Sequence, residues 1–156
     1  MANILGQAFA WLIFERKIRG KSYMDYRRLF GESSTVIQDL IDRAEDDAKS
    51  RWELLHVIGM ERWMQSRMKV ALGAPFIQEE YDGYRPPEDT PWADLKQTFI
   101  EVREASCDLC TEFDAKNVDA AQKIKHNQAG PMSVKAWMEY VLRHGNGHAK
   151  RMTLRP

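Results

Sequence analysis

The stretch TPWADLKQTFIEVREASCDLCTEF, residues 90–113, carries the clearest structural signal in this chain of 156 residues. Its buried-type residues recur at alternating spacings of three and four positions: Trp92, Leu95, Phe99, Val102, Ser106, Leu109 and Phe113. This spacing places them on one face of an α-helix. Thr90 suits the N-cap, and Pro91 suits the first helical position, where its missing N–H costs nothing. The stretch therefore predicts a long helix with one buried face.

Helical periodicity continues on both sides of this stretch, and no segment predicts a β-strand. Apolar residues at helical spacing predict a helix over residues 22–46. Ser50 and Glu53 have the form of a capping box at the start of another helix, which ends near Gly73. Ser133, which follows Gly130-Pro131, predicts the start of the last helix.

We therefore predict an all-α fold, a four-helix bundle in a single domain over residues 1–156. Residues 1–19 would add a short N-terminal extension helix that lengthens the bundle, caps one end or forms a contact in a homodimer. Two long connections remain, residues 73–89 and 114–131. Connections of this length often form the walls of functional sites.

Composition excludes several classes of protein. The chain has 23 Lys and Arg against 23 Asp and Glu, so no excess of positive charge indicates nucleic acid as a partner. The longest apolar run, Ala8–Phe14, is too short to span a membrane, and no signal peptide is evident. Cys107 and Cys110 lie deep in a predicted helix, which favours buried, inert thiols in the reducing cytoplasm over a redox pair.

Three of the four histidines point to a shared site. His144 and His148 are four residues apart, so on a helix they lie on one face, together with Val134, Trp137 and Val141. His56 also lies on an apolar face of its own helix. Buried imidazoles need polar partners, and one divalent metal ion would satisfy all three. The fourth, His126, lies in a polar stretch and is expected in a loop, or else lining the cleft.

Two alternatives stay open for these residues. The three histidines could instead be hydrogen-bonded side chains of the core. Gly145-Asn146-Gly147 also has turn-forming composition, and if the helix ended at Arg143 the two rings would not need to share a face. Within a helix, such small residues would allow a neighbouring group to approach closely.

The sequence ELLHVIGMERW, residues 53–63, together with His144-x-x-x-His148, resembles the DinB/YfiT-like metal-binding proteins. The resemblance extends over nearly the whole chain. It implies a four-helix bundle of up-up-down-down topology, in which His56, His144 and His148 bind a divalent metal. Zinc or nickel would be the usual ion, and iron also suits three imidazoles. The chain departs from the common pattern at Gly145 and at Lys150-Arg151.

The resemblance also implies an activity. Better-understood members use a low-molecular-weight thiol, such as bacillithiol or mycothiol, against a small electrophile. A metal-dependent thiol transferase or thiol-dependent isomerase is therefore the first hypothesis. A non-catalytic metal-binding or stress-response protein is the second, and a partner-binding bundle without metal is the third. Side chains expected near the ligands are Glu53, which could orient His56 from one turn away, and Trp63, Arg143 and Asn146. Tyr81 and Tyr84 of the first long connection could overhang the site or pack back on the core. Glu61 is expected to be solvated or to contact a neighbouring helix.

Overall fold

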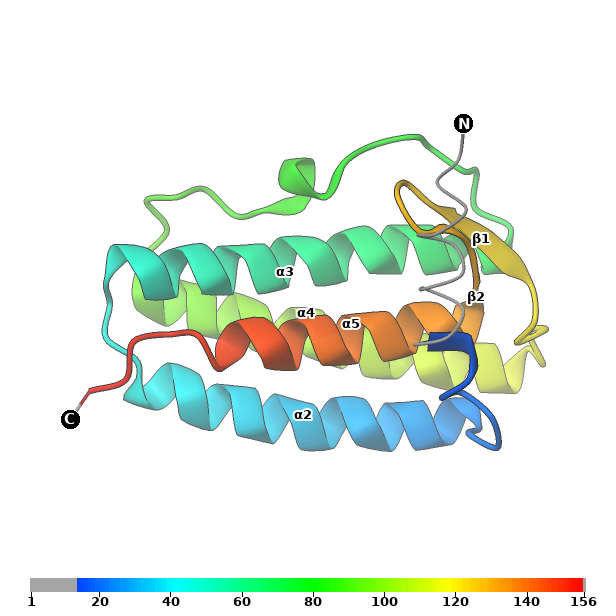
Figure 1. Ribbon diagram of the computed structural model, residues 1–156, viewed down its shortest axis with the longest axis horizontal. Coiled ribbons are helices and arrows are strands. Elements are labelled where there is room, and N and C mark those ends of the chain that lie inside the picture. Colours follow the sequence, from blue (N-terminus) through cyan, green and yellow to red (C-terminus); the bar gives the residue numbers. More distant parts are fainter. Residues whose placement is uncertain (1–13, 156) are drawn as a thin grey trace.

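Four long α-helices and one short β-hairpin make up residues 14–155, the part of the chain that the computed structural model describes (Figure 1). The helices are α2 (Tyr23–Arg43), α3 (Ala48–Lys69), α4 (Trp92–Ala115) and α5 (Val134–Ala149). Short 3-10 turns, η2 (Val70–Leu72) and η3 (Tyr81–Tyr84), lie between α3 and α4. The helix expected within residues 1–19 falls largely outside the described residues. No helix in residues 14–155 is both long and apolar enough to cross a bilayer.

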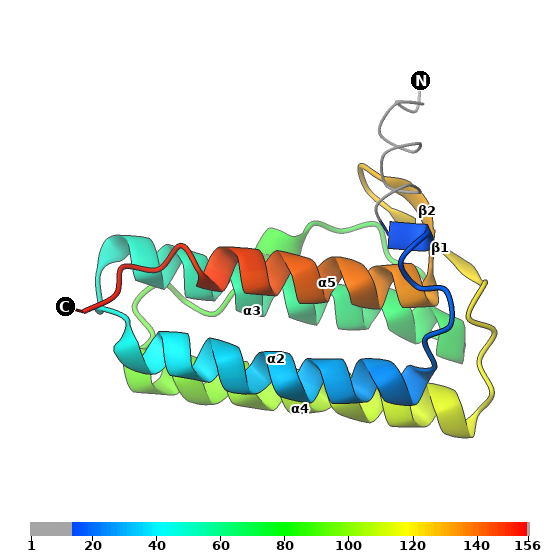
Figure 2. The same ribbon diagram turned by 60° about the horizontal axis from the view of Figure 1, so that its bottom comes forward.

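The four helices pack side by side, with α2 against α4 and α3 against α5 (Figure 2). In Figure 1, α3 and α4 run in one direction, and α2 and α5 run in the other. This up-down-down-up order differs from the up-up-down-down order that the resemblance implied. The connection formed by residues 44–47 spans at most about 14 Å. Because α2 is 21 residues long, or about 31 Å, α3 has to start at the end where α2 stops.

Local capping sets where each helix begins, and two predicted starts shift. Ser133 caps α5 as predicted, because its side chain accepts a hydrogen bond from the Ala136 amide. α3 begins earlier than predicted: Asp47 is its N-cap and accepts from the Ser50 amide. Ser50 and Glu53 therefore form no capping box, and Glu53 is free for another role. α4 begins at Trp92, one residue after the predicted start.

The expectation of no strands was wrong for residues 123–133. β1 (Lys123–His126) and β2 (Gly130–Ser133) form an antiparallel hairpin, with Ile124 opposite Met132. Side chains alternate along β1, so Ile124 and His126 are buried while Lys123 and Lys125 are exposed. Four residues are too few for this alternation to stand out in a polar sequence. His126 is therefore a strand residue of the interior, not a loop residue.

A buried ion pair lies between the two apolar clusters of the core. Glu61 of α3 and Arg103 of α4 are each 1% exposed, and their side chains are 2.9 Å apart. The Arg103 guanidinium lies over the rings of Phe30 and Phe99, one from each cluster. The inter-helix role expected of Glu61 is thus confirmed. α5 leaves room for this pair at Gly145, where a Cβ would stand 3.3 Å from Arg103 Nη2.

Candidate metal centre

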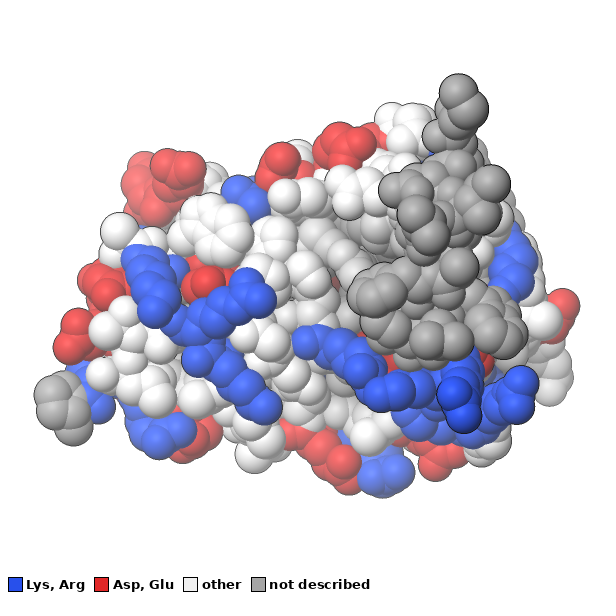
Figure 3. Space-filling model, in the orientation of Figure 1, with Lys and Arg blue, Asp and Glu red and all other residues white. Residues whose placement is uncertain are grey.

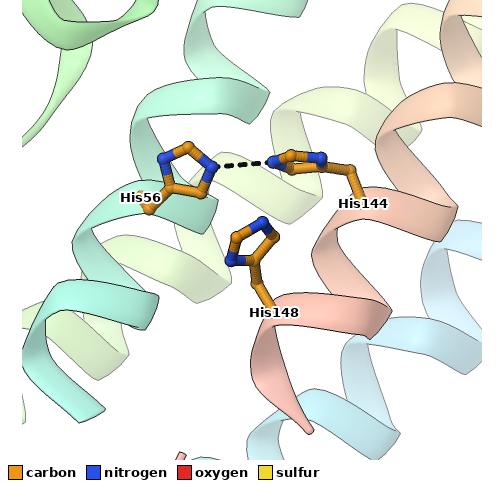
Figure 4. Close-up of side chains that lie close together, drawn as sticks. All are labelled: His56, His144 and His148. Atoms are coloured by element: carbon orange, nitrogen blue, oxygen red, sulfur yellow. Dashed lines mark hydrogen bonds between the residues drawn. The ribbon is translucent and has the colours of Figure 1, made fainter. Parts of the chain in front are cut away.

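Two helices bring the three predicted histidines together. His56 comes from α3, and His144 and His148 come from successive turns of α5, which continues as a helix through Gly145-Asn146-Gly147 (Figure 4). The Nε2 atoms of His56 and His144 are 2.8 Å apart, and one ring nitrogen of each histidine lies within 4.8 Å of the others. Nitrogens that bind one zinc ion tetrahedrally lie about 3.3 Å apart. The three histidines could therefore hold a metal ion after small shifts of their rings.

Burial keeps the imidazoles of His56 and His144 uncharged. Burial, followed by the nearby His148 and Arg85, lowers the pKa of His56 to about 4. Burial, followed by His148 and His56, lowers the pKa of His144 to about 3. Both rings are therefore neutral near pH 7, and the neutral ring is the form that binds a metal.

Glu53 orients His148. Its Oε2 lies 2.5 Å from Nδ1 of His148, and both side chains are about nine-tenths buried. Because a carboxylate accepts hydrogen bonds, the Nδ1–H of His148 donates to it and leaves the Nε2 lone pair for a metal. The sequence suggested Glu53 as a partner of His56, one turn away on the same helix; the structure places it on His148, across the helix interface.

Arg85, in the connection before α4, contacts His56. Its Nη2 lies 3.0 Å from Nδ1 of His56. A guanidinium only donates, so Nδ1 accepts, and the ring proton of His56 stands on Nε2, where it donates to His144. Gly59 makes this approach possible, because a Cβ there would stand 2.7 Å from Cγ of Arg85. To bind a metal through Nε2, His56 would have to move its proton to Nδ1 and release Arg85.

The model of one protein family, described as the DinB superfamily, matches residues 35–152. The chain belongs to the DinB superfamily. The matched residues contain the three histidines, all of α3, α4 and α5, and the C-terminal part of α2, residues 35–43. Searches of curated proteins and of solved structures found no match. Family membership confirms the resemblance drawn from the histidine spacing, and leaves the chemistry of this DinB protein to be argued from its own residues.

The other residues expected near the ligands are divided among three places. Trp63 lines a cavity that His56 and His144 also line. Arg143 lines a separate groove with His144 and His148. Asn146 instead faces α2, where its Oδ1 accepts a hydrogen bond from Ser33.

The two tyrosines of the long connection also separate. Tyr81 overhangs the centre as expected, with its ring edge-on to His56 at 5.1 Å between centroids. Tyr84 does not overhang it, because its hydroxyl hydrogen-bonds the carboxylate of Glu79.

Sequence reasoning missed two residues of this DinB centre, Trp52 and Arg85, and named the cleft only as the second of two places for His126. Trp52 is 49% exposed and stacks on His56 with 5.0 Å between ring centroids. Its position four residues before His56 is a signal that could have placed it there. Arg85 and His126 reach the centre through tertiary packing, which leaves no spacing to recognise.

Replacement of Glu53 by glutamine is expected to weaken metal binding by about tenfold to a hundredfold, because the amide orients His148 less strongly than the carboxylate does. Competition with a chromophoric chelator measures this change. Glu104→Gln, an exposed position on α4, is the matched control and should bind metal as the wild type does. Equal affinities in the two variants would contradict the role given to Glu53.

Replacement of Arg85 by methionine is expected to strengthen metal binding. It removes a positive charge beside His56 and the hydrogen bond that keeps the ring proton on Nε2, so metal affinity should rise by about tenfold. The same chelator competition measures it. Arg62→Met, on α3 but away from the histidines, controls for loss of an arginine. Weaker metal binding in Arg85→Met would show that Arg85 supports the centre instead of opposing it.

Proposed function

We propose that this DinB-family protein is a metal-dependent transferase that activates a low-molecular-weight thiol for attack on a small electrophile. The observation that carries the proposal is the convergence of three imidazoles, from α3 and α5, within 4.8 Å. Three protein ligands leave a divalent ion with positions for further ligands, as in catalytic zinc sites. When bound, such an ion supplies positive charge that favours a thiolate over a thiol near neutral pH. Zinc and nickel are the ions we favour.

Two hollows beside the histidines offer separate places for two substrates. One is a groove of about 330 Å³ lined by Arg143, Arg151 and the α5 histidines, on a face where Figure 3 shows Lys and Arg side chains gathered. Its charge suits the carboxylates that cellular thiols commonly carry. The other is a cavity of about 200 Å³ with aromatic walls, which suits a less polar electrophile. In the reaction the S–H bond breaks, an S–C bond forms, and the electrophile takes up the proton.

A cobalt-loaded protein tests this proposal. The protein is purified without a His tag, loaded with Co²⁺ and titrated with cysteine, bacillithiol or mycothiol. Binding of the thiolate to the ion should change the visible absorption spectrum, whereas S-methylcysteine, which has no thiol proton to lose, should leave it unchanged. No response to any of the thiols would overturn the transferase proposal.

A non-catalytic protein with a structural or sensory ion is the second candidate. It is favoured by one observation: the three histidines would tie α3 to α5 through a single ion. In that case metal would raise the melting temperature, and the cobalt spectrum would not respond to thiols. Either function is proposed for the reducing cytoplasm, with small molecules as partners, and the homodimer stays a prediction.

A further inference from the structure

The cavity of about 200 Å³ beside the histidine centre has chemically different ends. His56 and His144 line it on the side of the metal centre, and His126 lines it on the side of the hairpin. Its walls include the rings of Trp63, Tyr81 and Tyr140 and the side chain of Met60. A space of this shape suits a small, flat molecule that offers a polar atom to the hairpin side.

His126 has a fixed tautomer. Its Nδ1 accepts hydrogen bonds from the backbone amides of Gln128 and Ala129, each at 3.1 Å. An amide N–H can only donate, so Nδ1 carries no proton and the proton of the neutral ring is on Nε2. Burial, and after it the nearby Arg67, lowers the pKa of His126 to about 4, so the ring is neutral at pH 7.

Among the residues that the structure describes, the Nε2–H of His126 is a buried donor without an acceptor. The residue is 7% exposed, and within residues 14–155 no side chain or backbone group hydrogen-bonds to this nitrogen. Buried polar atoms are nearly always hydrogen-bonded, and an unsatisfied one costs stability. Because Nδ1 is held by the backbone of the turn, Nε2 is the nitrogen left for a ligand. This atom has almost no accessible surface, so a ligand in the cavity reaches it when a neighbouring side chain shifts.

The turn that holds His126 is itself anchored to the connection over α3. The side-chain amide of Asn127 donates to the backbone carbonyl of Glu79 at 3.0 Å, and its Oδ1 accepts from Arg67 at 3.1 Å. Trp137 supports the imidazole from the other side, since the two ring centroids are 5.0 Å apart. The donor is therefore held in place before any ligand arrives, which reduces the entropy lost on binding.

We propose that this cavity binds a small conjugated carbonyl compound, whose oxygen accepts a hydrogen bond from Nε2–H of His126. The aromatic walls contact the flat part of the molecule, and its far end lies toward His56 and His144. A hydrogen bond to the carbonyl oxygen withdraws electron density from the conjugated carbons, which makes them better targets for a thiolate. In naming the electrophile's class, the inference rests on the proposed function.

Two probes of nearly equal shape test the inference. Acetophenone carries a carbonyl oxygen where α-methylstyrene carries a CH₂ group, and neither compound has a thiol group. Titration calorimetry with metal-loaded protein should show acetophenone binding roughly fivefold to tenfold more tightly, the value of one hydrogen bond. The proton attached to Nε2 of His126 should also shift downfield in NMR spectra when acetophenone is added. Equal affinities, or no binding of either probe, would overturn the inference.

Variants assign the preference to His126. His126→Phe should bind both probes equally, and His126→Gln, whose side-chain amide can donate from a similar place, should recover part of the difference. Lys125→Ala, on the exposed face of the same strand, should keep the full preference. If the hairpin does not tolerate either change of His126, the NMR shift in the wild type decides by itself. A preserved preference in folded His126→Phe would overturn the assignment.

The outcomes also separate this inference from the proposed function. If acetophenone binds more tightly than α-methylstyrene but the cobalt spectrum does not respond to thiols, the ligand cavity is supported and the transferase proposal is overturned. If the cobalt spectrum responds to thiols but the two probes bind equally, the transferase proposal is supported and the role given to His126 is overturned.

Discussion

Replacement of His148 by alanine is expected to abolish stoichiometric metal binding. The wild type, produced without a His tag, should contain close to one equivalent of divalent metal per chain, as measured by elemental analysis. Loss of one of three imidazole ligands should weaken affinity by more than about a hundredfold, since loss of a residue that only supports a ligand already costs ten- to a hundredfold. Because His148 is the ligand held by Glu53, its removal also leaves that buried carboxylate without its partner.

His126 provides the matched control for this experiment. It is a buried histidine like His148, it lies on the hairpin instead of α5, and it is not one of the three clustered rings. His126→Phe should therefore retain the metal. In addition, metal should raise the melting temperature of the wild type and of His126→Phe but not that of His148→Ala. A full complement of metal in His148→Ala would remove the assigned centre, and with it the proposed chemistry.

Replacement of Arg103 by methionine is expected to destabilise the protein by about 3–5 kcal/mol, which is the usual cost of removing one partner of a buried ion pair. The variant leaves Glu61 at the centre of the bundle without a countercharge. Its remaining partner there is the Ser106 hydroxyl, which donates to Oε1 at 2.6 Å. Urea unfolding followed by circular dichroism measures the change in the free energy of unfolding.

A double variant separates the ion pair from simple packing. Glu61→Met with Arg103→Met replaces both charges by apolar side chains and should recover most of the lost stability, because an apolar pair often equals a buried ion pair. Arg28→Met removes an exposed partner of Glu32 and should change stability by less than about 1 kcal/mol. If Arg103→Met cost no more than Arg28→Met, the buried pair would have no structural importance.

Local sequence was sufficient to predict most of the helices. The alternating spacing that begins at Leu95 and ends at Phe113 follows from the 3.6-residue turn and needs no knowledge of the neighbours. Ser133 capped α5 as predicted, since a cap is formed by residues within one turn. At α3 the predicted cap was Ser50, but Asp47, three residues earlier, is the N-cap, and the Ser50 side chain instead accepts from the Thr153 amide in the C-terminal segment.

The hairpin is the element that sequence reasoning did not find. Its strands have four residues each, and four residues are too few to show a convincing alternation of apolar and polar side chains. The pairing of one strand with the other across the turn cannot be seen in either strand alone. This error affects the description of the site, because His126 belongs to β1 of the hairpin and lines the cavity from there.

By itself, the sequence determined that the chain is helical, that His144 and His148 share a face, and which family the chain belongs to, because these depend on regular spacing along the chain. Only the tertiary structure decided that His56 faces them across α3 and α5, that Glu53 supports His148, that Arg85 contacts His56, and that His126 lines a cavity with His56 and His144. These contacts join residues brought together by packing and by irregular connections, where no periodic rule relates position in the sequence to position in space.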